Sequence, residues 1–163
     1  MRIIGIDPGT AITGFSIIES DKGVIRLLDF GCIRTKAGLA QGTRLNQIAE
    51  DITTLVEKWK PHQASVEKLF FKKNVKTAMT VSEARGVIIQ KFTEKGVELS
   101  EFTPLEIKSA VCGYGRADKK MVQEMVRLTF NMETVPKPDD AADAIAAAIC
   151  LANSLKFKER LIA

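Results

Sequence analysis

The sequence predicts one α/β domain whose mixed β-sheet is covered by helices on both faces. Short β-favouring runs separated by turn residues make up the first 35 residues. Further along the chain, apolar residues at helical spacing alternate with two more short strand-like runs. A chain of 163 residues without a repeat or a long linker fits a single domain. We place this domain at residues 1–155 and treat 156–163 as a C-terminal tail.

Three antiparallel strands are expected at the start. The runs Ile3–Asp7, Thr13–Glu19 and Val24–Thr35 have β-favouring composition. Pro8-Gly9 separates the first two runs, and Asp21-Lys22-Gly23 separates the second from the third. Tight turns of this kind join neighbouring antiparallel strands, so we expect a three-stranded meander.

The pattern then changes to helices that alternate with strands. Apolar residues recur every three or four positions over Leu45–Trp59, and Pro61 ends this predicted helix. Gln63–Glu67 reads as a fourth strand. A long helix is predicted over Val75–Glu94, with Gly96 just beyond its end.

The last third is expected to contain one strand and three helices. Val97–Phe102 is the fifth predicted strand, and Pro104 suits the first turn of a helix over Leu105–Val111. Two further helices are predicted over Asp118–Phe130 and Asp139–Leu155. Antiparallel strands followed by strands that alternate with helices imply a mixed sheet of five strands.

Composition excludes several classes of protein. No apolar stretch reaches the roughly 20 residues that cross a bilayer, and the first residues lack a signal-peptide pattern, so we expect a cytoplasmic protein. His62 is the only histidine, which argues against histidine-based zinc sites and Ser-His-Asp triads. The three cysteines are expected to be reduced thiols. A net charge of +4 is weak support for a polyanionic partner.

Four carboxylates stand at the ends of predicted elements. Asp7 and Glu67 end strands, and Asp140 and Asp143 lie three residues apart at the start of the alanine-rich last helix. Small residues allow this helix to approach the sheet closely. Each carboxylate also has a plain structural explanation, as a turn residue, a solvated strand end or a helix cap. Asp139 fits best as the N-cap.

Together the four carboxylates predict a metal site. Clustered carboxylates repel one another and raise each other's pKa unless cations neutralise them. Oxygen ligands without histidine or cysteine suit Mg²⁺ or Mn²⁺. A pair of such ions promotes in-line displacement at phosphorus. The sequence therefore favours phosphoryl chemistry at Asp7, Glu67, Asp140 and Asp143.

Four motifs in order resemble one known family. The segments GIDPGT, VEKLFFKKN, EARGV and DAADAIAAA are similar in sequence and spacing to the RuvC Holliday-junction resolvases of bacteria, from Met1 to about Leu155. The resemblance implies a ribonuclease-H-like fold and places the family's acidic tetrad on the same four carboxylates. Some relatives have histidine at the third acidic position, where this chain has Asp140.

The resemblance also implies an activity and partners. The expected function is Mg²⁺-dependent resolution of four-way DNA junctions by paired symmetric nicks during recombination and repair. Two Mg²⁺ ions per subunit are expected, Mn²⁺ can substitute, and the ends carry 5′-phosphates and 3′-hydroxyls. A homodimer and a partnership with the branch-migration complex RuvA–RuvB follow from the same resemblance.

Basic and aromatic residues next to these carboxylates are expected to bind DNA. The resemblance places Phe70 at the junction crossover and Lys108 and Lys119 near the scissile phosphate, with Lys119 as a catalytic residue. The alternative is that the phenylalanines belong to the core and the lysines to a solvated surface. The full predicted set is Phe70, Phe71, Lys72, Lys73, Asn74, Lys76, Lys108, Arg116, Lys119 and Lys120.

Three other functions fit parts of the sequence. GIDPGT also suits the phosphate loop of actin-like and sugar-kinase folds, but those proteins duplicate the domain, and this chain is too short for two. A nuclease of the same fold acting on RNA–DNA hybrids has a similar carboxylate set. A junction-binding protein without activity is disfavoured, because four carboxylates facing phosphates would weaken binding.

Overall fold

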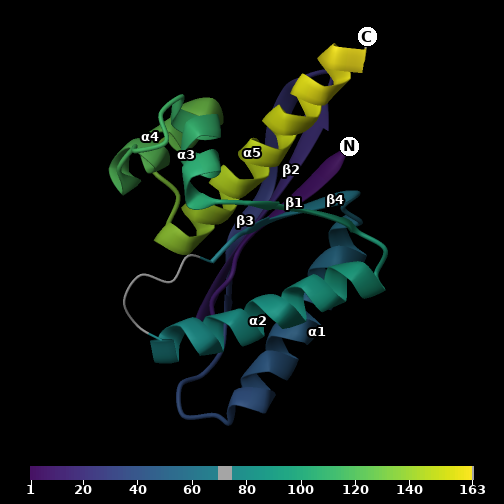
Figure 1. Cartoon of the computed structure of the whole chain (residues 1–163), viewed down its shortest axis with the longest axis vertical. Helices are drawn as coiled ribbons and strands as arrows, with labels where there is room; N and C mark the ends of the chain where they lie inside the picture. The colour runs from purple at the N-terminus through teal and green to yellow at the C-terminus, as the bar shows by residue number, and fades with distance from the viewer. Residues whose placement is uncertain (70–74, 163) are drawn as a thin grey trace.

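The computed structural model describes residues 1–69 and 75–162. Its centre is a five-stranded sheet in the order β3-β2-β1-β4-β5, with helices on both faces (Figure 1). This confirms the predicted fold class, and the element order βββαβαβααα is also as predicted. The strands are β1 (Arg2–Asp7), β2 (Ile12–Asp21), β3 (Val24–Arg34), β4 (Gln63–Glu67) and β5 (Glu98–Phe102).

The helices form a layer on each face of the sheet. In Figure 1, α1 and α2 lie below the sheet, while α5, α3 and α4 lie above it. No helix in the described ranges combines the length and the hydropathy needed to cross a membrane. The helices are α1 (Gln41–Trp59), α2 (Val75–Glu94), α3 (Pro104–Cys112), α4 (Lys119–Thr129) and α5 (Asp139–Ile162).

The central strand β1 has one antiparallel and one parallel neighbour. It pairs antiparallel with β2, where Asp7 lies opposite Gly14. It pairs parallel with β4, where Ile6 lies beside Val66. Since parallel strands end at the same edge of a sheet, the carboxyl ends of β1 and β4 are neighbours. This register brings Asp7 and Glu67 to one edge, although 60 residues separate them in sequence.

Alternation along β1 decides which face each side chain occupies. Ile4 and Ile6 are fully buried in the core that the sheet shares with α1 and α2. Ile3 is buried in the opposite core, against α5. Gly5 and Asp7 follow at two-residue spacing and therefore face α5 as well. The same alternation puts Glu67 on the α5 face of β4, because Val66 belongs to the core on the other side.

Two glycines let α5 approach the sheet unusually closely. A Cβ atom at Gly5 would overlap the backbone carbonyl oxygen of Ala144. A Cβ atom at Gly14 would overlap the carbonyl oxygen of Asp140. The backbone of α5 therefore lies directly on β1 and β2, and its own alanines leave no bulk in between. This confirms the predicted close packing of the alanine-rich helix.

Two buried serines fix α5 at one position along the sheet. Ser16 of β2 donates a hydrogen bond of 2.9 Å to the carbonyl oxygen of Ala144. Ser65 of β4 donates one of 2.7 Å to the carbonyl oxygen of Ala147. Both hydroxyls are fully buried, so a helix shifted along the sheet would leave them unsatisfied, at about 1–3 kcal/mol each.

Several element ends differ from the prediction. Helix α5 continues to Ile162, seven residues past the expected Leu155, so the boundary drawn at 155 falls inside a helix. Helix α1 already begins at Gln41, where no apolar periodicity marks its first turn. Asp118 is the N-cap of α4, its carboxylate accepting a hydrogen bond from the backbone N–H of Met121. The three cysteines are free, as expected.

Gly5→Ala is expected to lower the free energy of unfolding by about 3 kcal/mol, because its methyl group would push α5 off the sheet. The measurement is urea unfolding followed by circular dichroism. Gly42→Ala is the matched control: a Cβ atom there meets nothing within 4 Å among the described residues, so stability should stay the same or rise slightly. An equal decrease in the free energy of unfolding in Gly5→Ala and Gly42→Ala would contradict the explanation by close contact with α5.

Candidate active site

Hydroxyl groups brace the turn that follows Asp7. Thr13 donates a hydrogen bond of 2.6 Å to the carbonyl oxygen of Gly9. Thr10 donates one of 2.8 Å to the carbonyl oxygen of Thr80 in α2, and Thr35 donates one of 2.6 Å to the carbonyl oxygen of Thr10. The turn is thus attached to α2 and to the end of β3, so the Asp7 carboxylate is held in place at the sheet edge.

Glu67 is held by the end of the sheet. Glu67 lies beside Phe102 in the β4–β5 pair. The backbone N–H of the next residue, Lys68, donates a hydrogen bond of 2.8 Å to the carbonyl oxygen of Phe102. Helix α3 starts two residues after Phe102. Thr103 and Glu106 form a capping box at its first turn, which orients α3 alongside Glu67.

Helix α5 contributes the remaining carboxylates from its first two turns. The carbonyl oxygen of Asp140 lies against Gly14, directly opposite Asp7 in the β1–β2 pair. Asp143 is one turn further along and is mostly buried, with 30% of its side chain exposed. The four predicted carboxylates therefore gather where β1, β4 and the start of α5 meet.

The pKa values show that these carboxylates influence one another. Burial raises the pKa of Asp7 from 3.8 to about 8, with further contributions from Glu67, Asp143 and Asp140. Burial raises the pKa of Glu67 to about 7, and the charge of Asp143 adds to the shift. The pKa of Asp143 is raised as well, chiefly by burial. The site thus concentrates negative charge that a cation would stabilise.

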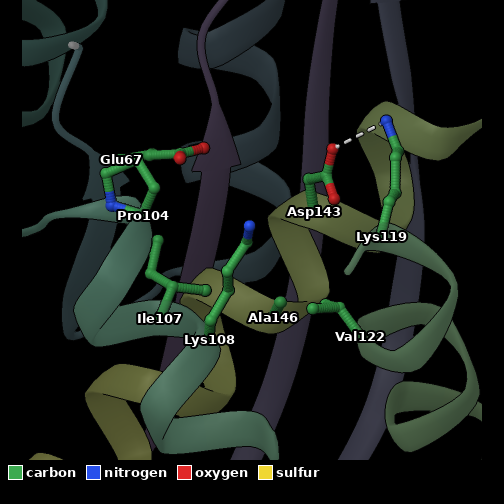
Figure 2. Close-up of a pocket in the computed structure, with 8 residues that line it drawn as sticks. All are labelled: Glu67, Pro104, Ile107, Lys108, Lys119, Val122, Asp143 and Ala146. Atoms are coloured by element: carbon green, nitrogen blue, oxygen red, sulfur yellow. Dashed lines mark ion pairs between the residues drawn. The ribbon is translucent and has the colours of Figure 1, made fainter. Parts of the chain in front are cut away.

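Two lysines and two of the carboxylates line one pocket of about 240 Å³ (Figure 2). Its lining includes Glu67, Lys108 of α3, Lys119 of α4 and Asp143. The Nζ atom of Lys119 lies 3.3 Å from Oδ2 of Asp143 and 3.2 Å from Oδ2 of Asp139. Lys108 and Lys119 both act to lower the pKa of Glu67. Positive groups from α3 and α4 therefore lie close to the carboxylates Glu67 and Asp143.

The donor chemistry suits a hard divalent cation. Within residues 1–69 and 75–162, no three His, Cys, Asp or Glu side chains are arranged closely enough to hold a metal ion. Asp143 directs one carboxylate oxygen toward the ammonium group of Lys119. The four carboxylates nevertheless supply only oxygen ligands around one buried group, Asp7, as Mg²⁺ and Mn²⁺ prefer.

The structure brings only part of the predicted DNA-binding set to this pocket. Lys108 and Lys119 line it, whereas Arg116 and Lys120 are exposed and absent from its lining. Lys76 is the second residue of α2. The remaining predicted contacts lie outside the described residues: Phe70, Phe71, Lys72, Lys73 and Asn74.

Sequence reasoning missed residues that position the carboxylates. Gly5, Gly14, Ser16 and Ser65 attracted no prediction, although alternation along the strands places them on the same face as Asp7. Glycine and serine at alternate positions of otherwise apolar strands could have indicated a face of the sheet that a helix approaches closely. Asp139 was expected to be an N-cap. It is instead the first residue of α5, and its side chain bonds to α4.

Comparison with known proteins gives consistent matches. The family model described as crossover junction endodeoxyribonuclease RuvC matches residues 3–151. A protein of that name from Chloroflexus aggregans is 51% identical over 160 residues, covering 98% of each chain. Another from Finegoldia magna is 49% identical over 158 residues, covering 97% of this chain and 96% of the relative.

A solved structure matches the fold over nearly the whole chain. Thermus thermophilus RuvC, determined in complex with a Holliday junction substrate, superimposes with a TM-score of 0.91 at 28% sequence identity. The match covers 97% of this chain and 96% of that one. The fold is therefore ribonuclease-H-like, as expected from the motifs.

Asp7→Asn is expected to stabilise the folded protein in EDTA, by about 2 kcal/mol or more at pH 8. The pKa of Asp7 is about 8 in the folded protein and near 3.8 when unfolded, so the fold favours the protonated form. The cost of charging Asp7 is absent below pH 3.8, grows as the pH rises, and is complete above about 8.

Urea unfolding of wild type and Asp7→Asn at pH 5 and pH 8 measures this difference. The increase in the free energy of unfolding of Asp7→Asn over wild type should be clearly larger at pH 8 than at pH 5. Glu133→Gln, which removes an exposed carboxylate, serves as the control and should show no such dependence. A gain for Asp7→Asn that is the same at both pH values would rule out the electrostatic explanation.

Proposed function

The chain belongs to the RuvC family of crossover junction endodeoxyribonucleases and is a Holliday junction resolvase, and we propose that it cuts DNA at the cluster of Asp7, Glu67, Asp140 and Asp143. The observation that carries this proposal is the partly buried position of Asp7 near three other carboxylates, with two lysines in the pocket that Glu67 and Asp143 line. Such a site is costly for folding and is well suited to phosphoryl transfer.

Members of this family are divalent-metal-dependent nucleases. We propose Mg²⁺ as the metal, two ions per subunit, with Mn²⁺ as a substitute, held by the four carboxylates. These residues would hold the cations, and the chemistry supplied there would be a lowered pKa of the attacking water and an offset of charge on the phosphate. The role of the protein is to keep four oxygen-bearing side chains at fixed places on β1, β4 and α5.

The lysines stabilise charge that develops during cleavage. The attacking water loses a proton to solvent as its oxygen forms a bond to phosphorus. The bond from phosphorus to the 3′-oxygen breaks, and the 3′-oxygen takes up a proton from solvent. The products are a 5′-phosphate and a 3′-hydroxyl. Negative charge grows on the phosphate oxygens, and the ammonium groups of Lys119 and Lys108, which line the same pocket, stabilise that charge.

DNA is proposed to approach the pocket across its basic side. Lys68, Arg116 and Lys120 are exposed around the ends of β4 and α3 and at the start of α4. Phosphate contacts from such residues position the duplex arms. From the resemblance of VEKLFFKKN to the family's motif, we propose that Phe70–Lys76 also contact DNA, with Phe70 or Phe71 stacking on a base at the crossover.

A homodimer is proposed as the working unit. A four-way junction has approximate two-fold symmetry, and C₂ is the commonest symmetry of oligomers. Two symmetric sites would make the paired nicks that separate the duplexes during recombination and repair. We also propose the cytoplasm as its location and the RuvA–RuvB branch-migration complex as its partner, both on family membership.

Wild-type protein is expected to nick a synthetic mobile four-way junction in Mg²⁺, whereas Asp7→Asn binds the junction but cuts at least about 100-fold more slowly. Gel assays of cleavage, with binding followed in EDTA, measure both steps. Asp51→Asn, a carboxylate of α1 on the other face of the sheet, should cut like wild type.

Two results would contradict this assignment. Cleavage by Asp7→Asn at the wild-type rate would remove Asp7 from the site. Faster cleavage of an RNA–DNA hybrid than of the junction would favour the related nuclease activity instead.

Light scattering should give a mass of about twice 17.9 kDa for the protein alone. The complex should have the mass of this one dimer plus one junction. The physical reason is the matching two-fold symmetry of dimer and substrate. A monomer with and without junction DNA would exclude paired cutting by a stable dimer.

A further inference from the structure

Asp139 makes contacts that the tetrad does not explain. Its Oδ2 atom lies 3.2 Å from Nζ of Lys119, and its Oδ1 atom accepts a hydrogen bond of 2.9 Å from Nε2 of Gln123. Lys119 and Gln123 lie one turn apart on α4, while Asp139 opens α5. A single carboxylate thus joins the first turns of two helices and contacts a lysine of the pocket.

Lys119 bridges two carboxylates of different environment. Asp143 is largely buried, whereas Asp139 has 58% of its side chain exposed. Asp139 also accepts the hydrogen bond from Gln123, so its carboxylate has a second contact on α4 where it meets the ammonium group of Lys119.

The two carboxylates cannot serve Lys119 in the same way during the reaction. Asp143 belongs to the set that would hold the cations, so its oxygens would be shared between cation and lysine. Asp139 lies outside that set, and Gln123 already orients it. A lysine side chain with four rotatable bonds loses much conformational freedom when it is held, so a fixed partner matters for its placement.

We propose that Asp139 is a positioning residue, which with Gln123 holds the Lys119 ammonium group beside the scissile phosphate. The inference rests on the proposed function. Asp139 touches neither water nor phosphate in this scheme and acts through Lys119. The Lys119–Asp139 ion pair is exposed, and surface ion pairs usually contribute little to the free energy of unfolding. We therefore expect the loss of Asp139 to change the cleavage rate and not the stability.

Asp139→Asn is the first test, because it keeps the shape of the side chain and removes its charge. The single-turnover rate of junction cleavage in Mg²⁺ should fall about 10-fold. Glu133→Gln is the matched control, as it removes one exposed carboxylate charge shortly before α5 and should cut at the wild-type rate. Asp139→Glu, which keeps the charge, should recover part of the loss.

Junction affinity in EDTA separates positioning from binding. Asp139→Asn and Glu133→Gln change the net charge equally, so their dissociation constants should agree within about twofold. Both variants should keep the wild-type circular dichroism spectrum. Weaker binding by Asp139→Asn than by its control would overturn the proposal, because Asp139 would then act on DNA binding.

A double-mutant cycle with Lys119→Met completes the test. If Asp139 acts through Lys119, Asp139→Asn should change the rate less than twofold once Lys119 is replaced. A 10-fold loss that persists in the Lys119→Met protein would overturn the proposal, as would wild-type cleavage by Asp139→Asn. Failure of the wild-type protein itself to cut junctions would instead refute the proposed function.

Discussion

The direct contact between helix α5 and the sheet is the constraint on which the site depends. Helices usually pack on sheets through layers of side chains, yet here Gly5 and Gly14 allow helix backbone to touch strand backbone. Ser16 and Ser65 then fix the helix along the strands by hydrogen bonds to its carbonyl oxygens. This contact brings the acidic start of α5 to the strand ends.

The same contact creates an electrostatic conflict within the folded protein. Asp7 is buried next to carboxylates that raise its pKa to about 8. Apolar packing on both faces of the sheet must offset this cost, and the isoleucines of β1 contribute to both cores. Lys119 relieves part of the repulsion through Asp143. The arrangement lowers stability and places four carboxylates at one end of the sheet, where their charges influence one another.

Much of this was predictable because it depends on local pattern. Strand alternation, helical periodicity and turn residues identified every element in order, and elements bounded by proline or glycine were placed best. Errors arose where local signals stop: α1 begins four residues before its first apolar position, and α5 continues to Ile162. Residues at these two ends are largely exposed, as Gly42, Thr43, Phe157 and Leu161 are, so the helices continue there through backbone hydrogen bonding, which apolar periodicity does not record.

The sequence by itself determined the fold class, the order of elements and the four carboxylates, because these follow from residue type and spacing along the chain. Only the tertiary structure decided the strand order, the faces on which Asp7 and Glu67 lie, and the contacts of Asp139. These features depend on contacts between segments distant in sequence. The bond from Gln123 to Asp139, across the α4–α5 connection, is such a contact.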